Sequence, residues 1–355
     1  MNSAAPPLAQ THEATGKAAR VPATPRLALL ACWLPVAGWL MLAVLMVVPA
    51  IGGSRYLLYL GTLIALQAAL ATSLNLVMGY AGQFAMSHAA FYGFGAYASA
   101  LLVSGAGVGF WISIPLTMLL AAVLAACIGY PALRYTGGVH LALITFAFGE
   151  LARLLAANWH SVTGGPMGMR VLYSPEPLLG FSFATSRGLY WLATGMLLVS
   201  LLIVFLVQRS RFGRALVAVR EDEVLAAFLG INVVAHKLAA YVMSSMMAAM
   251  IGTAYAPFMS FISPELLNAH QTISLIGVLI LGGIGTLSGP IIGTLVFFGI
   301  PELLRVAQLY RLVILGAVII VGVLFMPQGI SGLIRQRLKR WTRDVGMATP
   351  EAVKR

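Results

Sequence analysis

Long apolar runs, separated by short breaks rich in glycine, proline or charge, dominate the chain. A helical run of about 18 or more apolar residues is long enough to cross the hydrocarbon core of a bilayer. From run length and these breaks we predict ten membrane-spanning helices: 27–48, 56–78, 84–103, 110–130, 138–157, 188–208, 237–257, 271–288, 290–304 and 309–326. The pattern therefore predicts an all-α polytopic membrane protein with about ten transmembrane helices.

The composition supports this class and excludes a water-soluble fold. Of the 355 residues, 60% are apolar and 9% are charged, whereas soluble domains carry about 25% charged residues. The net charge of +12 does not indicate nucleic-acid binding, because the basic residues lie at the ends of apolar runs and not in a stripe with aromatics. Both cysteines, Cys32 and Cys127, lie within apolar runs and are expected to be packing residues.

The termini differ from the apolar body of the chain. Residues 1–26 are rich in Ala, Thr and Pro and are predicted to form a disordered cytoplasmic tail. The first apolar run is too long, and begins too far into the chain, for a usual signal peptide, so we expect a retained span. Residues 27–327 form the predicted transmembrane domain, and residues 328–355 form a basic cytoplasmic tail.

The distribution of Lys and Arg predicts the orientation. Ten spans place both termini on one side, and basic residues are enriched in cytoplasmic loops. With the termini, the Arg134 loop and the loop 209–236 in the cytoplasm, sixteen Lys and Arg residues are cytoplasmic and six are external. The glycine-rich hairpins at 79–83 and 288–290 are either true loops or re-entrant segments.

The loop 209–236 contains the stretch VREDEVLAAFLGIN. Residues 213–229 include good helix formers without proline, and Gly230 is a natural helix stop, so we predict one short cytoplasmic helix. Its acids lie beside apolar residues that a solvated loop does not need, including Leu225 and Phe228. This mixture is typical of a protein-docking surface; the alternative is a solvated connection.

Four motifs, in the same order along the chain, resemble a known family. FGRALVAVREDEVLAAFLGINV resembles the cytoplasmic coupling segment of the LivM-like branched-chain amino acid permeases of ABC importers. SLNLVMGYAGQFAMSHAAFYGFGAYASALL, TFAFGELARLLAANWHSVTGGPMGM and LIGVLILGGIGTLSGPIIGTLVF resemble three further segments of that family. The resemblance covers most of 73–327, while the first 70 residues contain no matching motif.

The resemblance implies a permease subunit that pairs with a second, LivH-like permease subunit, binds two cytoplasmic ATPase subunits and receives substrate from a periplasmic binding protein. It places the chain in the bacterial inner membrane, carrying branched-chain or other hydrophobic amino acids; urea or a short amide is the alternative substrate. The sequence contains no GxxxxGK[ST] motif, so ATP is bound by the partners and no cofactor is expected in this chain. The residues expected to couple to the ATPase are Arg220, Glu221, Asp222, Glu223, Leu225, Phe228 and Gly230.

A glycine-rich break between the second and third predicted spans indicates a substrate path. Broken helices expose half-helix ends that bind charged groups of small substrates near the midplane of the membrane. The residues around this break are Asn75, Gly79, Gly82, Gln83, Ser87 and His88. The alternative for His88 is a hydrogen bond to a neighbouring helix that fixes packing. GGIG at 282–285 occupies a comparable position to GYAG at 79–82 and hints at an internal repeat.

Three other features have simpler expected roles. Gly285, Gly289 and Gly293 are spaced by four for close helix packing, with an interruption expected at Pro290 between the last two. Glu150 and Arg153 are expected to form an intrahelical pair. The external loop 159–187 is the candidate docking site for the binding protein, in particular through Thr163, Gly164, Gly165, Pro166, Met167 and Gly168; otherwise it is only a connection.

Two other function classes are less compatible with the sequence. An ion-coupled transporter or channel needs carboxylates inside the membrane, and the predicted spans contain few acids, Glu150 among them, and no Asp. A membrane-embedded enzyme is disfavoured because no HExxH motif, paired aspartates or Ser, His and Asp arrangement occurs. We therefore expect a transport subunit and not an enzyme, with no bound metal.

Overall fold

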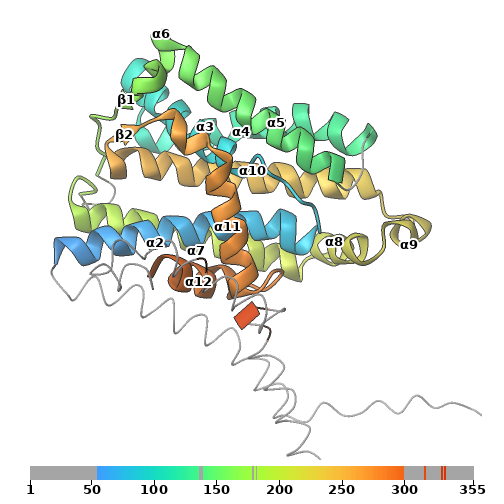
Figure 1. Cartoon of the computed structure of the whole chain (residues 1–355). Coiled ribbons are helices and arrows are strands. Elements are labelled where there is room, and N and C mark those ends of the chain that lie inside the picture. Colours follow the sequence, from blue (N-terminus) through green and yellow to red (C-terminus); the bar gives the residue numbers. More distant parts are fainter. Residues whose placement is uncertain are drawn as a thin grey trace, which may run out of the picture.

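Long helices lying side by side form the body of the chain (Figure 1), whose computed structural model describes residues 54–135, 139–177, 180, 182–299, 316, 329–330 and 332. Within this part, five helices are long and apolar enough to cross a membrane: α2 (Arg55–Asn75) with the π-helical turn η1 (Leu76–Tyr80), α4 (Phe110–Tyr135), α5 (Val139–Asn158), α7 (Ser186–Arg209) and α10 (Val233–Met259). Each coincides with a predicted span. The helical membrane architecture is thereby confirmed.

The count of ten spans stays a prediction. The predicted span 27–48 lies outside the described residues, and so does 309–326 except for Gly316. The tail 1–26 and most of 328–355 also lie outside them. The shorter elements are α3 (His88–Ala100), η2 (Leu101–Gly105), α6 (His160–Thr163), η3 (Gly165–Met167), β1 (Met169–Arg170), α8 (Arg211–Glu221), α9 (Glu223–Phe228), β2 (Phe261–Ile262), η4 (Pro264–Leu267), α11 (Ala269–Gly282), α12 (Gly289–Thr294) and η5 (Leu295–Gly299).

The connection between α2 and α3 runs back into the bundle. After η1 the chain forms neither helix nor strand over residues 82–87, and α3 begins only at His88, four residues after the start of the predicted span 84–103. His88 Nε2 lies 2.8 Å from Ser73 Oγ of α2, about two helical turns before the end of η1. The segment is therefore re-entrant, and α3 is a half-helix that starts inside the bundle.

Glycines allow α3 and α10 to pack in close contact. A Cβ atom on Gly95 would overlap the Ala249 carbonyl oxygen, and one on Gly252 would overlap the Tyr92 carbonyl oxygen. Close backbone approach is favourable in membranes, where helices associate through van der Waals contact rather than through the hydrophobic effect. Replacing either glycine would push α3 and α10 apart.

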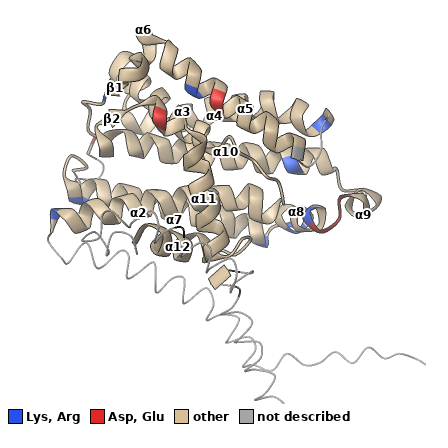
Figure 2. Cartoon of the chain, viewed as in Figure 1, with Lys and Arg blue, Asp and Glu red and all other residues tan. Residues whose placement is uncertain are grey.

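The two ends of the bundle carry different structures. α8 and α9 lie at one end in Figure 1, and α6 with the antiparallel pair β1–β2 lies at the other. The 27 residues of α10 connect α9 to β2, a distance of about 40 Å at 1.5 Å per residue. Figure 2 shows charged residues around α8 and α9 and near helix ends, while the middle of α2 and α7 carries none.

Candidate functional site

The prediction of one cytoplasmic helix over 213–229 is wrong in one respect, because the structure has two helices there, α8 and α9. Asp222 ends α8 with extended backbone angles (φ −155°, ψ 111°). Its carboxylate accepts hydrogen bonds of 2.9 Å from the backbone N–H groups of Val224 and Leu225 and so caps α9. N-cap Asp satisfies N–H groups that have no partner within their helix. Gly230, with φ 81°, follows the end of α9 as predicted.

The other two acids of the triplet are paired within the chain. Glu221 lies 2.6 Å from the guanidinium of Arg220, and Glu223 pairs with Lys237 at the start of α10. Both acids were expected to couple to the ATPase, which stays a prediction. In the described structure each already has a basic partner in its own chain.

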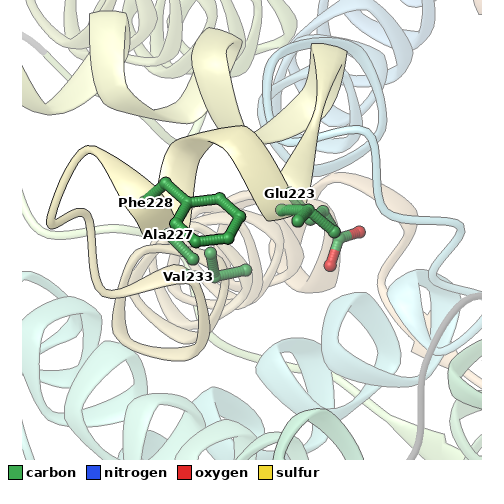
Figure 3. Close-up of a pocket in the computed structure, with 5 residues that line it drawn as sticks. Glu223, Ala227, Phe228 and Val233 are labelled. Carbon is green, nitrogen blue, oxygen red and sulfur yellow. The ribbon is translucent and has the colours of Figure 1, made fainter.

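The segment also exposes large apolar side chains beside its charged residues. Phe228 is 85% exposed, and the other members of this face are Val224, Leu225 and Leu229. A shallow depression beside it is lined by Glu223, Val224, Ala227, Phe228 and Val233. Figure 3 shows Phe228, Ala227 and Val233 together, with the Glu223 carboxylate to one side. We call Val224, Leu225, Phe228 and Leu229 the α9 face.

The two glycine-rich breaks predicted to be related in sequence lie against each other. The buried Asn75 amide holds them together, since Oδ1 accepts from Gly285 N at 2.8 Å and Nδ2 donates to Thr286 O at 2.9 Å. A Cβ atom on Gly79 would lie 2.6 Å from Gly285 N. We call this contact between GYAG and GGIG the glycine junction.

Arg220 connects α8 to the glycine junction. Its Nη1 donates a 2.7 Å hydrogen bond to the Gly79 carbonyl oxygen. A Cβ atom on Gly82 would lie 2.5 Å from Arg220 Cγ, and one on Gly285 would lie 3.1 Å from Nη1. Arg220 thus forms one site with Gly79, Gly82 and Gly285. From the sequence, these residues were assigned to three separate roles: ATPase coupling, substrate path and helix packing.

Polar side chains of the re-entrant segment make contacts across the bundle interior. Ser87 Oγ lies 2.7 Å from Tyr241 Oη of α10, and His88 bonds Ser73 of α2. Gln83 differs from both, because its amide is 3% exposed and neither Oε1 nor Nε2 has a hydrogen-bond partner among the described residues. Of the predicted path side chains, Gln83 is the one whose hydrogen-bonding groups are free to accept a ligand.

Gly289 and Gly293 lie against α11, as expected for packing positions. A Cβ atom on Gly289 would overlap the Gly283 carbonyl oxygen, and one on Gly293 would overlap that of Val278. The expected interruption between them is wrong, because α12 runs from Gly289 through Gly293 with Pro290 in its first turn. Proline is tolerated there because its missing N–H has no helical acceptor.

Glycines shape the first part of the loop 159–187, which is predicted to be external. Gly164, Gly165 and Gly168 all have positive φ, and Thr163 Oγ1 donates to two carbonyl oxygens, including that of Trp159 at 2.7 Å. Pro166 and Met167 lie in η3, and Met167 is 84% exposed. The predicted intrahelical pair is confirmed, with Arg153 Nε 2.8 Å from Glu150 Oε2.

Several partners at these sites could not be found from the sequence. No local pattern pairs them with the groups they bond: Lys237 lies 14 residues from Glu223, Tyr241 154 residues from Ser87 and Thr286 211 residues from Asn75. Leu172, which is 90% exposed in the external loop, was also missed. Leu172 stands between Val171 and Tyr173, so no contrast with polar neighbours marks it in the sequence.

Comparison with known proteins gives concordant matches. Residues 55–323 match the model of the family described as branched-chain amino acid transport system / permease component. The high-affinity branched-chain amino acid transport system permease protein LivM of Salmonella typhimurium LT2 is 31% identical over 308 residues, covering 81% of this chain and 72% of the relative. LivM of Escherichia coli K12 is also 31% identical. LivH of E. coli K12 is 28% identical over 292 residues, covering 76% of this chain and 92% of the relative. No solved structure matches.

Proposed function

Because the chain belongs to the family of branched-chain amino acid transport permeases, we propose that it carries branched-chain or other hydrophobic amino acids across the bacterial inner membrane as one subunit of an ABC importer. The observation that supports this most is the α9 face, four exposed apolar side chains at the end of the bundle where a membrane-spanning chain meets water. Large exposed apolar groups at a rim indicate a protein partner.

The partner of the α9 face is an ATPase subunit. The sequence has no GxxxxGK[ST] loop to bind ATP phosphates, so hydrolysis takes place on separate chains. Two such chains serve the importer, one for each permease subunit. Phe228 and Leu225 enter a cleft of the ATPase, while Asp222 and the paired acids hold the segment in the shape that presents them.

The remaining partners contact other faces. The periplasmic binding protein docks on the external loop, where Met167 and Leu172 are exposed beside the rigid glycine turns. The LivH-like second permease packs on the lipid-exposed side of α4 and α5, whose outer residues include Leu119, Val123, Leu143 and Leu155. Both termini and the α8–α9 segment are cytoplasmic, following the excess of Lys and Arg there.

The substrate path runs along the re-entrant segment beside the glycine junction. Asn75, Ser87 and His88 position the backbone through their hydrogen bonds, whereas the free amide of Gln83 meets the substrate. Buried polar groups without partners cost stability unless something satisfies them, and a passing amino acid offers both donors and acceptors. Gly79 and Gly82 leave room beside the path for Gly285 and for the stem of Arg220.

The test is uptake by the assembled importer in proteoliposomes. The chain is co-expressed with the second permease and ATPase subunits of its own operon, and loaded binding protein is added outside. We expect ATP-dependent uptake of labelled leucine that competes with isoleucine and valine. Uptake of urea and not leucine would show that the substrate is a short amide and not a branched-chain amino acid. Uptake driven by an ion gradient without ATP would contradict the proposal.

A further inference from the structure

We propose that Arg220 is the positioning residue that transmits movement of the ATPase-bound α8–α9 segment to the substrate path, and that it does so by gripping the glycine junction. The inference rests on the proposed function and adds a specific mechanical link to it. It assigns the guanidinium of Arg220, an exposed residue of α8, to a contact within this chain and not to the ATPase, in contrast to the role expected from its neighbours in the sequence.

The geometry of the side chain supports this role. Its stem crosses Gly82, and its guanidinium reaches the Gly79 carbonyl oxygen at 2.7 Å and approaches Gly285. Any side chain at Gly82 would collide with Arg220 Cγ. Gly82 and Gly285 therefore leave the space that the side chain of Arg220 needs to reach from α8 to the glycine junction.

The electrostatics make the contact strong and directional. Gly79 lies in the last turn of the continuous helix formed by α2 and η1, where carbonyl oxygens have no partner within the helix. A cation is favoured at this negative end of the helix dipole. The same guanidinium also donates through Nη2 to Glu221 at 2.6 Å. The two terminal nitrogens of its planar fork therefore connect the end of α8 to the end of η1. A lysine ammonium carries the charge but lacks this fork.

The glycine junction is connected to both the re-entrant segment and the GGIG turn. Asn75 ties the GYAG turn to Gly285 and Thr286, which are 210 and 211 residues distant. Gly82 is followed directly by Gln83 and the re-entrant segment that leads to Ser87 and His88. A shift of α8 by an ATPase subunit therefore moves the start of the re-entrant segment and the GGIG turn together. Coupling between two sites acts in both directions, so substrate events on the path alter ATP hydrolysis through the same residue.

The experiment compares Arg220→Ala and Arg220→Lys with the matched control Arg214→Ala in the complete importer. Arg214 lies on the same helix and is exposed like Arg220, but among the described contacts its side chain bonds only to the Arg209 carbonyl oxygen and not to the glycine junction. Four quantities are measured: ATPase subunits co-purified, basal ATP hydrolysis, its stimulation by loaded binding protein, and leucine transported per ATP hydrolysed.

We expect both Arg220 variants to retain their ATPase subunits and basal hydrolysis, because the α9 face is unchanged. Stimulation and the transport ratio should fall about tenfold, the factor expected for loss of a charge-assisted hydrogen bond, with lysine giving partial rescue. Arg214→Ala should match the wild type. Normal coupling in Arg220→Ala overturns the proposal, as does loss of assembly in both Arg220 variants, which would make Arg220 a folding residue. A wild-type complex without ATP-driven uptake would instead contradict the proposed function.

Discussion

At the residue scale, buried amide side chains that bond across the fold differ from that of Gln83, which is among the buried polar groups of the described residues without a partner. Both groups of the Asn75 amide are bonded across the glycine junction. Gln67 Oε1 accepts a 3.0 Å hydrogen bond from Gln271 Nε2 between α2 and α11. Gln83 is equally buried but has no such bond in the described part of the chain. This contrast supports a role for Gln83 in binding and not in folding.

Replacing Gln83 with Leu should therefore leave stability intact and impair transport. A buried amide without partners costs about 1–3 kcal/mol, so Gln83→Leu should keep or raise the thermal unfolding midpoint of the purified permease. Leucine uptake should fall at least about tenfold, the loss expected when a substrate contact worth one hydrogen bond disappears. The matched control, Gln67→Leu, removes the bond to Gln271 and should lower the midpoint. Normal uptake by Gln83→Leu would exclude its role in the path.

At the element scale, the break between α8 and α9 shows where sequence patterns succeed and fail. Apolar length predicted α2, α4, α5, α7 and α10, because a bilayer demands long uninterrupted helices. The same propensities predicted one helix over 213–229, but the Asp222 carboxylate competes with α-helical hydrogen bonding and starts a new helix. The joining of Asn75 to Gly285 was unpredictable as well, since no local pattern records a contact over 210 residues.

The capping role of Asp222 gives a distinct mutational signature. Asp222→Ala removes both hydrogen bonds to the start of α9 and should cost about 0.5–2 kcal/mol of local stability, which reduces binding of ATPase subunits. Asp222→Asn keeps a capping oxygen but loses the charge, so it should retain nearly normal binding. The measurement is the salt-dependent affinity of the ATPase for the detergent-solubilised permease. If Asn impairs binding as much as Ala, the carboxylate acts through its charge on the partner.

At the scale of the whole molecule, the α9 face and the external loop occupy opposite ends of the bundle in Figure 1. The proposed orientation places α8 and α9 in the cytoplasm and Ser174 outside. Gln208 near the end of α7 and Ser174 are both exposed, and neither caps a helix as Ser210 does. They are therefore suitable positions for reporter cysteines.

In a variant whose Cys32 and Cys127 are replaced by alanine, a cysteine at Ser174 should react with an impermeant maleimide added to intact spheroplasts. A cysteine at Gln208 should react only after the membrane is opened. Each variant serves as the other's control, because the reagent and membrane are the same. Labelling of Gln208→Cys from outside would show that the orientation is the reverse of the proposed one. The α9 face could then not contact a cytoplasmic ATPase.

The central claim is that an ATPase binds the α9 face, and co-purification with Phe228→Ala tests it most directly. A large apolar side chain in a docking cleft contributes roughly 2 kcal/mol or more, so this variant should lose most of its ATPase at concentrations where the wild type retains it. Leu172→Ala is the control, since Leu172 is 90% exposed and Phe228 85% exposed, but they lie at opposite ends. Its ATPase content should be normal. Full retention of the ATPase by Phe228→Ala, or equal loss in both variants, would contradict the account.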